Sequence, residues 1–172
     1  MGKKVVHVVG TGTIGEPLIG LLCTMREELG LDEITFHKKS ALLEDRSKVK
    51  GVISMGAKLA ADDQAWTAFN ELGISPTLSV SAALEQAAVI IDCTPVGNEN
   101  KTSIYAGLAD GQKGFIAQGS EFGFGKPYAR GINDDALTPD DKFIQVVSCN
   151  THNLSVLIHT LGMNNGQKPG NL

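Results

Sequence analysis

Short apolar runs alternate along the chain with stretches in which apolar residues recur every three or four positions. The runs, rich in β-branched residues, predict buried strands, and the helical spacing predicts amphipathic helices. The predicted strands are residues 4–9, 33–37, 88–93, 114–118 and 143–148. The predicted helices are residues 17–29, 40–49, 62–72, 81–87, 98–108 and 150–161. Residues 122–141, rich in Gly, Pro and Asp, predict a loop.

Polar residues and glycines mark where several of these helices begin and end. Ser40 and Asp62 stand where an N-terminal cap is favoured, and Gly30 and Gly73 stand where a helix ends. Strands and helices that alternate at this length predict an α/β fold. We expect a three-layer, Rossmann-like arrangement, in which a mostly parallel sheet carries helices on both faces.

The composition is that of a soluble globular domain. The 172 residues are 42% hydrophobic, and we expect one domain over residues 1–165 followed by a polar tail over 166–172. The formal net charge of −4 gives no sign of a nucleic-acid partner, and no apolar stretch has the length of a membrane span. The three cysteines are widely spaced and predict neither a metal site nor a disulfide framework, which favours a reducing cytoplasm.

A glycine-rich loop connects the first predicted strand to the first predicted helix. Its residues are Gly10, Thr11, Gly12, Thr13, Ile14 and Gly15. A GxGxxG pattern alone is weak, but in this setting it is typical of a dinucleotide-binding site, and the alternative is an ordinary strand-to-helix turn. Gly10 permits the tight turn, Gly12 lets the backbone approach a pyrophosphate, and Gly15 lets helix and strand pack closely. Free N–H groups at the helix start then face the phosphates.

The residues that leave the second predicted strand bear on the choice of cofactor. NAD-binding domains usually carry an acid about 20 residues past the glycines, where it holds the ribose hydroxyls. This chain has His37, Lys38, Lys39 and Ser40 there. Lysines and a hydroxyl attract a 2′-phosphate, so the pattern favours NADP, with NAD as the second choice. The alternative is that these residues form a solvated basic corner.

Cys149 lies between the last predicted strand and the last predicted helix. The helix dipole and the free backbone N–H groups of a first helical turn favour a thiolate, which makes the thiol reactive. A lone cysteine at a strand end is also commonly a small buried hydrophobic residue. Position alone leaves both interpretations open.

Four motifs together resemble glyceraldehyde-3-phosphate dehydrogenase, and most closely its archaeal form. They are GTGTIG after the first strand, DCTPVG after the AVIID strand, FIAQGSE, and above all VVSCNTHNL. The likeness runs from residue 1 to about residue 165 in the order of the family. The SCNT element is specific, whereas the glycine loop is shared by many proteins.

The resemblance implies a glycolytic oxidoreductase that acts on a small phosphorylated aldehyde. Cys149 would attack the aldehyde carbonyl, and hydride transfer to the nicotinamide would leave a thioester that inorganic phosphate cleaves. Asn150 and Thr151 would lie against the nicotinamide and the phosphate. The residues that would lie along the cofactor at the strand ends are Thr94, Pro95, Gln118 and Gly119.

The chain departs from the family pattern in several places. His152 stands where the family has a small residue, Asn153 where it has glycine, and Ser120 where it has the second of two glycines. Residues 121–137 replace a more regular pair of strands and have no clear counterpart. His152 is expected to be a solvent-facing residue of the first helical turn.

The largest departure is length. In the family a second, catalytic domain follows the cysteine helix and supplies the base, the arginine for substrate phosphate and the main homo-oligomer interface, and we expect it to be absent here. We therefore expect the NAD(P)-binding half of a dehydrogenase, which binds dinucleotide but turns over poorly or not at all. A homo-oligomer is compatible with the resemblance.

Two alternatives stay open at the level of sequence. One is another cysteine-dependent phosphorylating aldehyde dehydrogenase, of the aspartate-semialdehyde type. The other is a non-enzymatic dinucleotide-binding module that senses redox state through Cys149. A self-contained module predicts a well-packed domain, so exposed apolar surface beside the cysteine would count against it.

Overall fold

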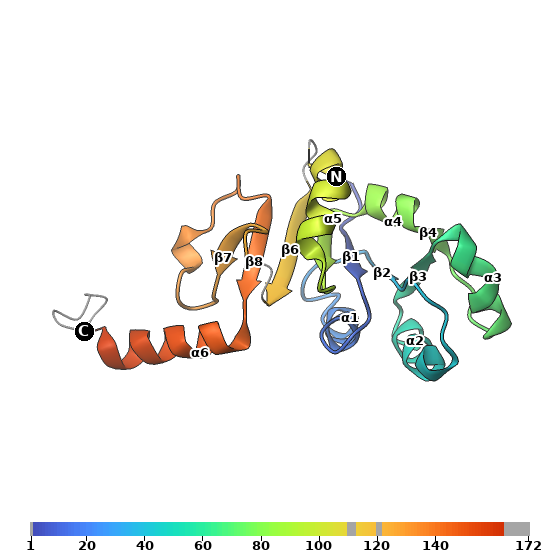
Figure 1. Ribbon diagram of the computed structural model, residues 1–172, viewed down its shortest axis with the longest axis horizontal. Coiled ribbons are helices and arrows are strands. Elements are labelled where there is room, and N and C mark those ends of the chain that lie inside the picture. Colours follow the sequence, from blue (N-terminus) through green and yellow to red (C-terminus); the bar gives the residue numbers. More distant parts are fainter. Residues whose placement is uncertain (1, 110–112, 120–121, 164–172) are drawn as a thin grey trace.

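A single sheet of eight parallel strands forms the centre of the molecule (Figure 1). The computed structural model describes residues 2–109, 113–119 and 122–163; the predicted tail at 166–172 lies outside them. The strands are β1 (Val5–Val9), β2 (Glu33–His37), β3 (Lys58–Ala61), β4 (Leu78–Ser79), β5 (Val89–Asp92), β6 (Gly114–Gly119), β7 (Lys126–Tyr128) and β8 (Phe143–Val147). Their order is β4-β3-β2-β1-β5-β6-β8-β7. The expected Rossmann-like α/β fold is confirmed.

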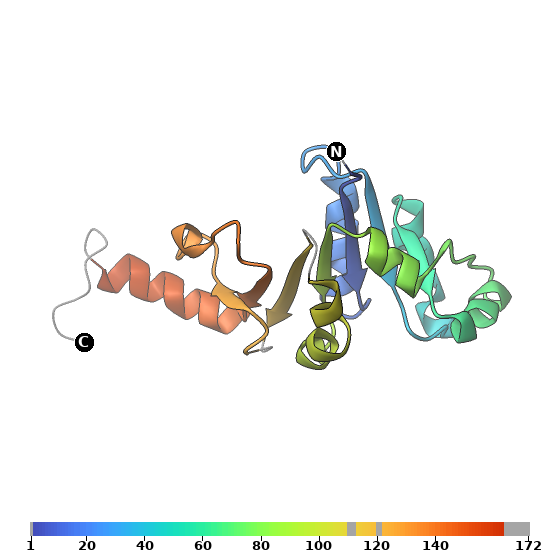
Figure 2. The same ribbon diagram turned by 90° about the horizontal axis from the view of Figure 1, so that it is seen from above.

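Helices cover both faces of this sheet (Figures 1 and 2). The α-helices are α1 (Gly15–Thr24), α2 (Arg46–Ser54), α3 (Asp63–Glu71), α4 (Val80–Gln86), α5 (Gly97–Ser103) and α6 (Cys149–Leu157). Short 3-10 helices span Leu43–Asp45, Tyr105–Leu108 and Asp134–Ala136, and a π-helical turn, Ile158–Gly162, extends α6. Helices α1 and α2 lie on one face, and α4 and α5 lie on the other.

Each face has its own hydrophobic core. Ile19 and Leu22 of α1 pack with Val49 and Val52 of α2 against the β1–β3 strands. The opposite core is aromatic, since Tyr105 stacks on Phe115, whose ring stacks in turn on Phe143 with centroids 4.6 Å apart. Apolar runs buried on both sides explain why the continuous β-branched patterns formed the central strands.

The turn between β1 and α1 is set by two glycines. Gly10 has φ +93°, a left-handed conformation that other residues avoid. A Cβ on Gly15 would lie 2.0 Å from the carbonyl oxygen of Gly10. Helix α1 therefore begins directly over the end of β1 only because Gly15 has no side chain.

The predicted helix 98–108 is α5 followed by the 3-10 helix Tyr105–Leu108, and the first two predicted helices also have different bounds in the structure. The first ends at Thr24 rather than at residue 29, and turns continue to Gly30, which has φ +62°. The second is α2, which begins at Arg46 and not near Ser40. Leu43, an apolar residue of the expected helix, is 73% exposed, and the buried stripe of α2 starts only at Val49.

Three strands were not predicted from the sequence. Strand β3 has the sequence KLAA, and alanine favours strands weakly, although Leu59 and both alanines are buried. Strand β4 has two residues, and β7 contains Pro127. A proline is tolerated there because β7 is the edge strand of the sheet. Residues 122–141 are otherwise irregular, as expected.

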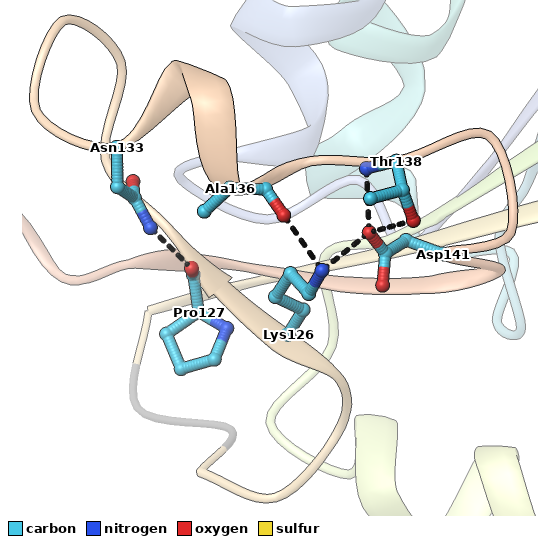
Figure 3. Close-up of polar contacts among 6 residues, drawn as sticks. All are labelled: Lys126, Pro127, Asn133, Ala136, Thr138 and Asp141. Carbon is cyan, nitrogen blue, oxygen red and sulfur yellow. Dashed lines mark hydrogen bonds and ion pairs between the residues drawn. The ribbon is translucent and has the colours of Figure 1, made fainter.

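A polar cluster fixes the connection from β7 to β8 (Figure 3). Lys126 donates to the carbonyl of Ala136 and forms an ion pair with Asp141, both at 2.6 Å. The same Asp141 oxygen accepts bonds from the backbone N–H and the hydroxyl of Thr138. Asn133 also donates to the carbonyl of Pro127, so the connection is tied back to β7 at both ends.

We expect this cluster to make stability depend on pH. The Lys126 side chain, and then the two Thr138 donors, hold the pKa of Asp141 below its ordinary value of 3.8. A depressed folded pKa gives stability that is complete above pH 3.8 and is lost as pH falls through the lower, folded value. Urea midpoints between pH 7 and pH 2.5 should therefore fall less steeply for Asp141→Asn than for the unchanged chain. Parallel curves would contradict this.

Candidate functional site

The carboxyl ends of all the strands lie at one edge of the sheet, because the strands are parallel. The glycine loop follows β1, the His37–Ser40 segment begins with the last residue of β2, and Cys149 follows β8. The connections leave β1 and β5 in opposite directions across the sheet, which is the switch point where open α/β sheets bind ligands. The structure thus brings together residues predicted from distant motifs.

A hollow of about 570 Å³ opens between the glycine loop and the end of β2. The residues that line it are Gly10, Thr11, Gly12, Thr13, Glu16, Lys38, Lys39, Ser40, Asp45 and Lys48. A Cβ added to Gly12 would have no protein atom within 4 Å, so the backbone there is open to a ligand. The open backbone beside a helix start fits a pyrophosphate. Gly15 is buried beneath the loop, and Ile14 is exposed.

The two lysines of this hollow differ in their surroundings. Lys38 lies 2.7 Å from the Asp45 carboxylate, and its side chain is only 13% exposed, so Asp45 engages its charge. Lys39 is exposed and lines this hollow, and it also lines a second hollow that lies beside the first. Lys48 also faces the hollow, 3.8 Å from Glu16.

A second hollow, of about 310 Å³, lies beside the first and is largely apolar. Its lining residues are Val9, Gly10, His37, Lys39, Asp62, Val80, Leu84, Thr94, Val96, Asn100, Ile104 and Tyr105. The volume is at the lower end of the range of about 300–1,000 Å³ for small-molecule pockets. Gly10 and Lys39 line both hollows, so they mark the boundary between them.

A buried carboxylate lies beneath the second hollow. Asp92 is 1% exposed and accepts bonds from the hydroxyl of Tyr105 at 2.6 Å and the amide of Asn100 at 2.8 Å. It also accepts from the backbone N–H and the hydroxyl of Thr94. Burial and the Asp92 charge raise the pKa of Tyr105 far above its ordinary value, so the phenol stays a donor. The network holds Thr94, Asn100 and Tyr105 in the pocket wall.

The residues expected along the rest of the cofactor lie at the ends of β5 and β6. Thr94 lines the second hollow, whereas the adjacent Pro95 is exposed. Gln118 and Gly119 close β6, and Gly119 has φ +74°. The Gly119 carbonyl accepts a bond from Gln145 of β8 at 3.2 Å, which fixes the two strand ends side by side.

Cys149 is the first residue of α6 and is exposed. Ser148 caps the helix, because its hydroxyl accepts a bond from the backbone N–H of Thr151. Asn150 and Thr151 are exposed beside the thiol. Neither of the two hollows includes these residues, so the structure places the thiol at the same edge of the sheet but outside them.

The unusual His152 has a contact of its own. Its Nε2 lies 3.0 Å from the backbone carbonyl of Arg130, in the segment that links β7 to β8. The ring is half-buried rather than turned wholly to solvent, which corrects the expectation from sequence. His152 thus connects the first turns of α6 to the segment that Asp141 holds.

Helix α6 extends away from the sheet (Figures 1 and 2). None of its residues is buried. Leu154 is 60% exposed, and Leu161, in the turn that follows, is 81% exposed. A helix with such apolar residues in water normally packs against something else.

The structure adds residues that the sequence did not single out for the site. Asp62 was expected only as a helix cap, but it lines the second hollow and its carboxylate contacts His37. Its position directly after β3 could have identified Asp62 as a site residue, but β3 was not predicted. Asn100 and Tyr105 were placed in a helix with no reason to expect a buried carboxylate beside them.

Comparison with known proteins finds similarities of sequence and of structure. No protein-family model matches the chain. The chain is 29% identical over 178 residues to a glyceraldehyde-3-phosphate dehydrogenase of Pyrobaculum calidifontis. The match covers 92% of this chain and 44% of that enzyme, so the chain spans less than half the length of this relative.

An imine reductase from Pseudomonas sp. is weakly similar in structure, with a TM-score of 0.43 and 20% sequence identity. The similarity covers 67% of this chain and 32% of that one. The sequence similarity and the order of the strands support a dehydrogenase-like chain that binds a nicotinamide dinucleotide. Within the described residues, no helix is long and apolar enough to cross a bilayer, and no group of three metal-ligating side chains gathers.

We expect the buried phenol to matter more than the exposed one. Tyr105→Phe removes a donor from a buried carboxylate and should lower the free energy of unfolding by about 2 kcal/mol. Tyr128→Phe is the matched control, because Tyr128 also donates to a carboxylate, Asp134, but at the surface. Urea denaturation of both variants tests this. Equal decreases in the free energy of unfolding would show that burial of the Asp92 network adds no stability.

The three thiols should differ in reactivity. Burial raises the pKa of Cys23 above 9.0, and burial with the Asp92 charge raises the pKa of Cys93 to about 12. The thiolate fraction of Cys93 near pH 8 is therefore about a thousand-fold lower than that of an ordinary thiol. Iodoacetamide followed by peptide mass spectrometry should label Cys149 first. Cys149→Ser should remove the fast phase of labelling. Early labelling of Cys93 would contradict the burial of its thiol.

Proposed function

We propose that this chain is the dinucleotide-binding half of a phosphorylating, cysteine-dependent aldehyde dehydrogenase of the glyceraldehyde-3-phosphate dehydrogenase type. The observation that carries the proposal is the shared strand edge, where an open glycine loop and an exposed cysteine at a helix start occur together. The similarity to the Pyrobaculum enzyme over 92% of the chain supports the same assignment.

The two hollows suit two parts of a nicotinamide adenine dinucleotide, the pyrophosphate and the adenine. The pyrophosphate would lie over Gly12, where the backbone is open and the start of α1 offers N–H groups. The adenine would enter the apolar second hollow. The adenosine ribose would lie between them, at the boundary formed by Gly10 and Lys39. The nicotinamide end would follow the ends of β5 and β6.

NADP is the cofactor that we favour, with NAD second. No acid occurs among the residues that leave β2, and Lys39 is exposed at the ribose boundary, where it can meet a 2′-phosphate. Lys38 contributes less than the sequence suggested, because Asp45 already engages its charge. Lys48 is a further cation that faces the same hollow.

Cys149 would be the nucleophile. Its thiolate would add to the carbonyl of a phosphorylated aldehyde, with the first-turn backbone N–H groups near the developing oxyanion. A dinucleotide held by the glycine loop would supply the acceptor for the hydride that leaves the carbon bonded to Cys149. The resulting thioester on Cys149 would be cleaved by inorganic phosphate, which releases the thiol and an acyl phosphate. Asn150 and Thr151, both exposed beside the thiol, would contact substrate or nicotinamide.

A further catalytic domain would complete the site. Among the described residues, no side chain hydrogen-bonds to the Cys149 sulfur, so the general base would come from elsewhere. The exposed leucines of α6 would pack against that domain. This surface argues against a self-contained redox sensor. The aspartate-semialdehyde type of dehydrogenase shares the reaction logic, and its substrate would separate the two assignments.

Calorimetric titration of the purified chain with NADP and NAD tests dinucleotide binding. Gly12→Ala places a methyl group where the pyrophosphate would lie, and should weaken binding of both dinucleotides about ten-fold or more without loss of stability. Gly107→Ala is the matched control, because its added Cβ also meets no protein atom within 4 Å but lies away from the loop.

The same titration addresses the choice of cofactor. The unchanged chain should bind NADP more tightly than NAD, and Lys39→Ala should reduce that preference. Binding of NAD alone would overturn the cofactor assignment and leave the dinucleotide site intact. No binding of either dinucleotide by the folded chain would overturn the proposed function.

A further inference from the structure

An acid that follows β3 lines the second hollow, although none leaves β2. Asp62 directly follows Ala61, the last residue of β3, and its side chain lines the second hollow. His37, the last residue of β2, lies on the same wall. The register pairs His37 with Ala60, so the two parallel strands end almost level. His37 and Asp62, the residue after β3, therefore come together on the wall of the hollow.

The two side chains form a directed contact. His37 Nε2 lies 3.2 Å from Asp62 Oδ2, and the histidine side chain is 16% exposed whereas the aspartate is 50% exposed. An ionised carboxylate only accepts hydrogen bonds, so the ring nitrogen donates. Asp62 caps α3 in position but makes no side-chain cap bond, because its carboxylate is turned to the histidine.

The charges around this contact come from three elements. Asp62 carries a negative charge at the end of β3, and Lys39 carries a positive charge just past the end of β2. The neighbouring Lys38 and Asp45 pair with each other on the other side of the boundary. A 2′-phosphate at the boundary would therefore be attracted by Lys39 and opposed by Asp62.

We propose that Asp62, restrained by His37, is the residue that limits the preference of this chain for NADP over NAD. The carboxylate disfavours a 2′-phosphate and tolerates a ribose hydroxyl, which can donate to it. The bond from His37 occupies one carboxylate oxygen, holds the group on the hollow wall and partly offsets its charge. The inference rests on the proposed function, since it assigns specificity within the dinucleotide site.

A double-mutant cycle with two ligands tests this inference. His37→Leu removes the donor, and Asp62→Asn removes the charge but keeps a side chain suited to a helix N-cap. Kd values for NADP and for NAD are measured by calorimetry at one ionic strength. His37→Leu should weaken NADP binding about ten-fold and leave NAD binding within about two-fold. Asp62→Asn should tighten NADP binding, and the double variant should match Asp62→Asn.

The chain offers a matched control between the same two strands. Glu33 of β2 and Lys58 of β3 form an ion pair of 2.8 Å at the opposite edge of the sheet. Glu33→Gln breaks that pair far from the hollows and should leave both Kd values unchanged. If the control altered selectivity as the His37 and Asp62 variants do, general loosening of the strands would explain the effect and the inference would fail.

The outcomes separate this inference from the proposed function. Equal changes of the two Kd values in Asp62→Asn, or no change in either, would overturn the role of Asp62 while dinucleotide binding stands. If His37→Leu does not fold, Asp62→Asn still decides the question. Its affinity for NADP relative to its affinity for NAD must rise above that of the unchanged chain. Failure of the unchanged, folded chain to bind either dinucleotide would overturn both proposals.

Discussion

The uniform direction of the strands is the constraint on which the rest of the structure depends. Because every ladder in the sheet is parallel, each strand delivers its last residue to the same edge. The glycine loop, the residues after β2 and the cysteine helix are separated by long stretches of sequence, yet all lie along that edge. Gly15 then fixes the first helix over β1, since no side chain would fit beneath the Gly10 carbonyl.

The wall of the apolar hollow is held from inside the protein. Asp92 is buried with a full set of donors, and those donors are side chains and backbone that also line the hollow. A buried carboxylate is costly unless its hydrogen-bonding capacity is filled. The network therefore couples the shape of the hollow to the packing of the aromatic core, and the pocket wall gains rigidity that a surface loop would lack.

Sequence patterns predicted the central elements well and the edges poorly. The bounds of β2, EITFH, were predicted without error, because a short stretch of β-branched and aromatic residues ends at a basic corner. Strand β3 was missed because Ala60 and Ala61 give no strand signal, although they are buried. Because β3 was missed, the contact between Asp62, which follows it, and His37 was missed as well.

The cysteine helix shows the same division between local and distant information. Its start was predicted from a strand end followed by polar residues, and Ser148 does cap it. The contact between His152 and the Arg130 carbonyl depends on a segment with no regular pattern, and sequence could not give it. The lysine that pairs with Asp45 likewise looked equivalent to its neighbour until side-chain positions were known.

The hydrogen-bonded pair of His37 and Asp62 on the wall of the hollow lies outside both hydrophobic cores. The His37 side chain is 16% exposed and that of Asp62 is 50% exposed, and neither belongs to the residues of the two cores. We expect substitutions at these two positions to disturb the folded sheet less than substitutions at Gly15 or Asp92. If Asp62 limits the choice of dinucleotide as proposed above, exchange of these two rim residues would shift that choice while the sheet that presents them is inherited unchanged.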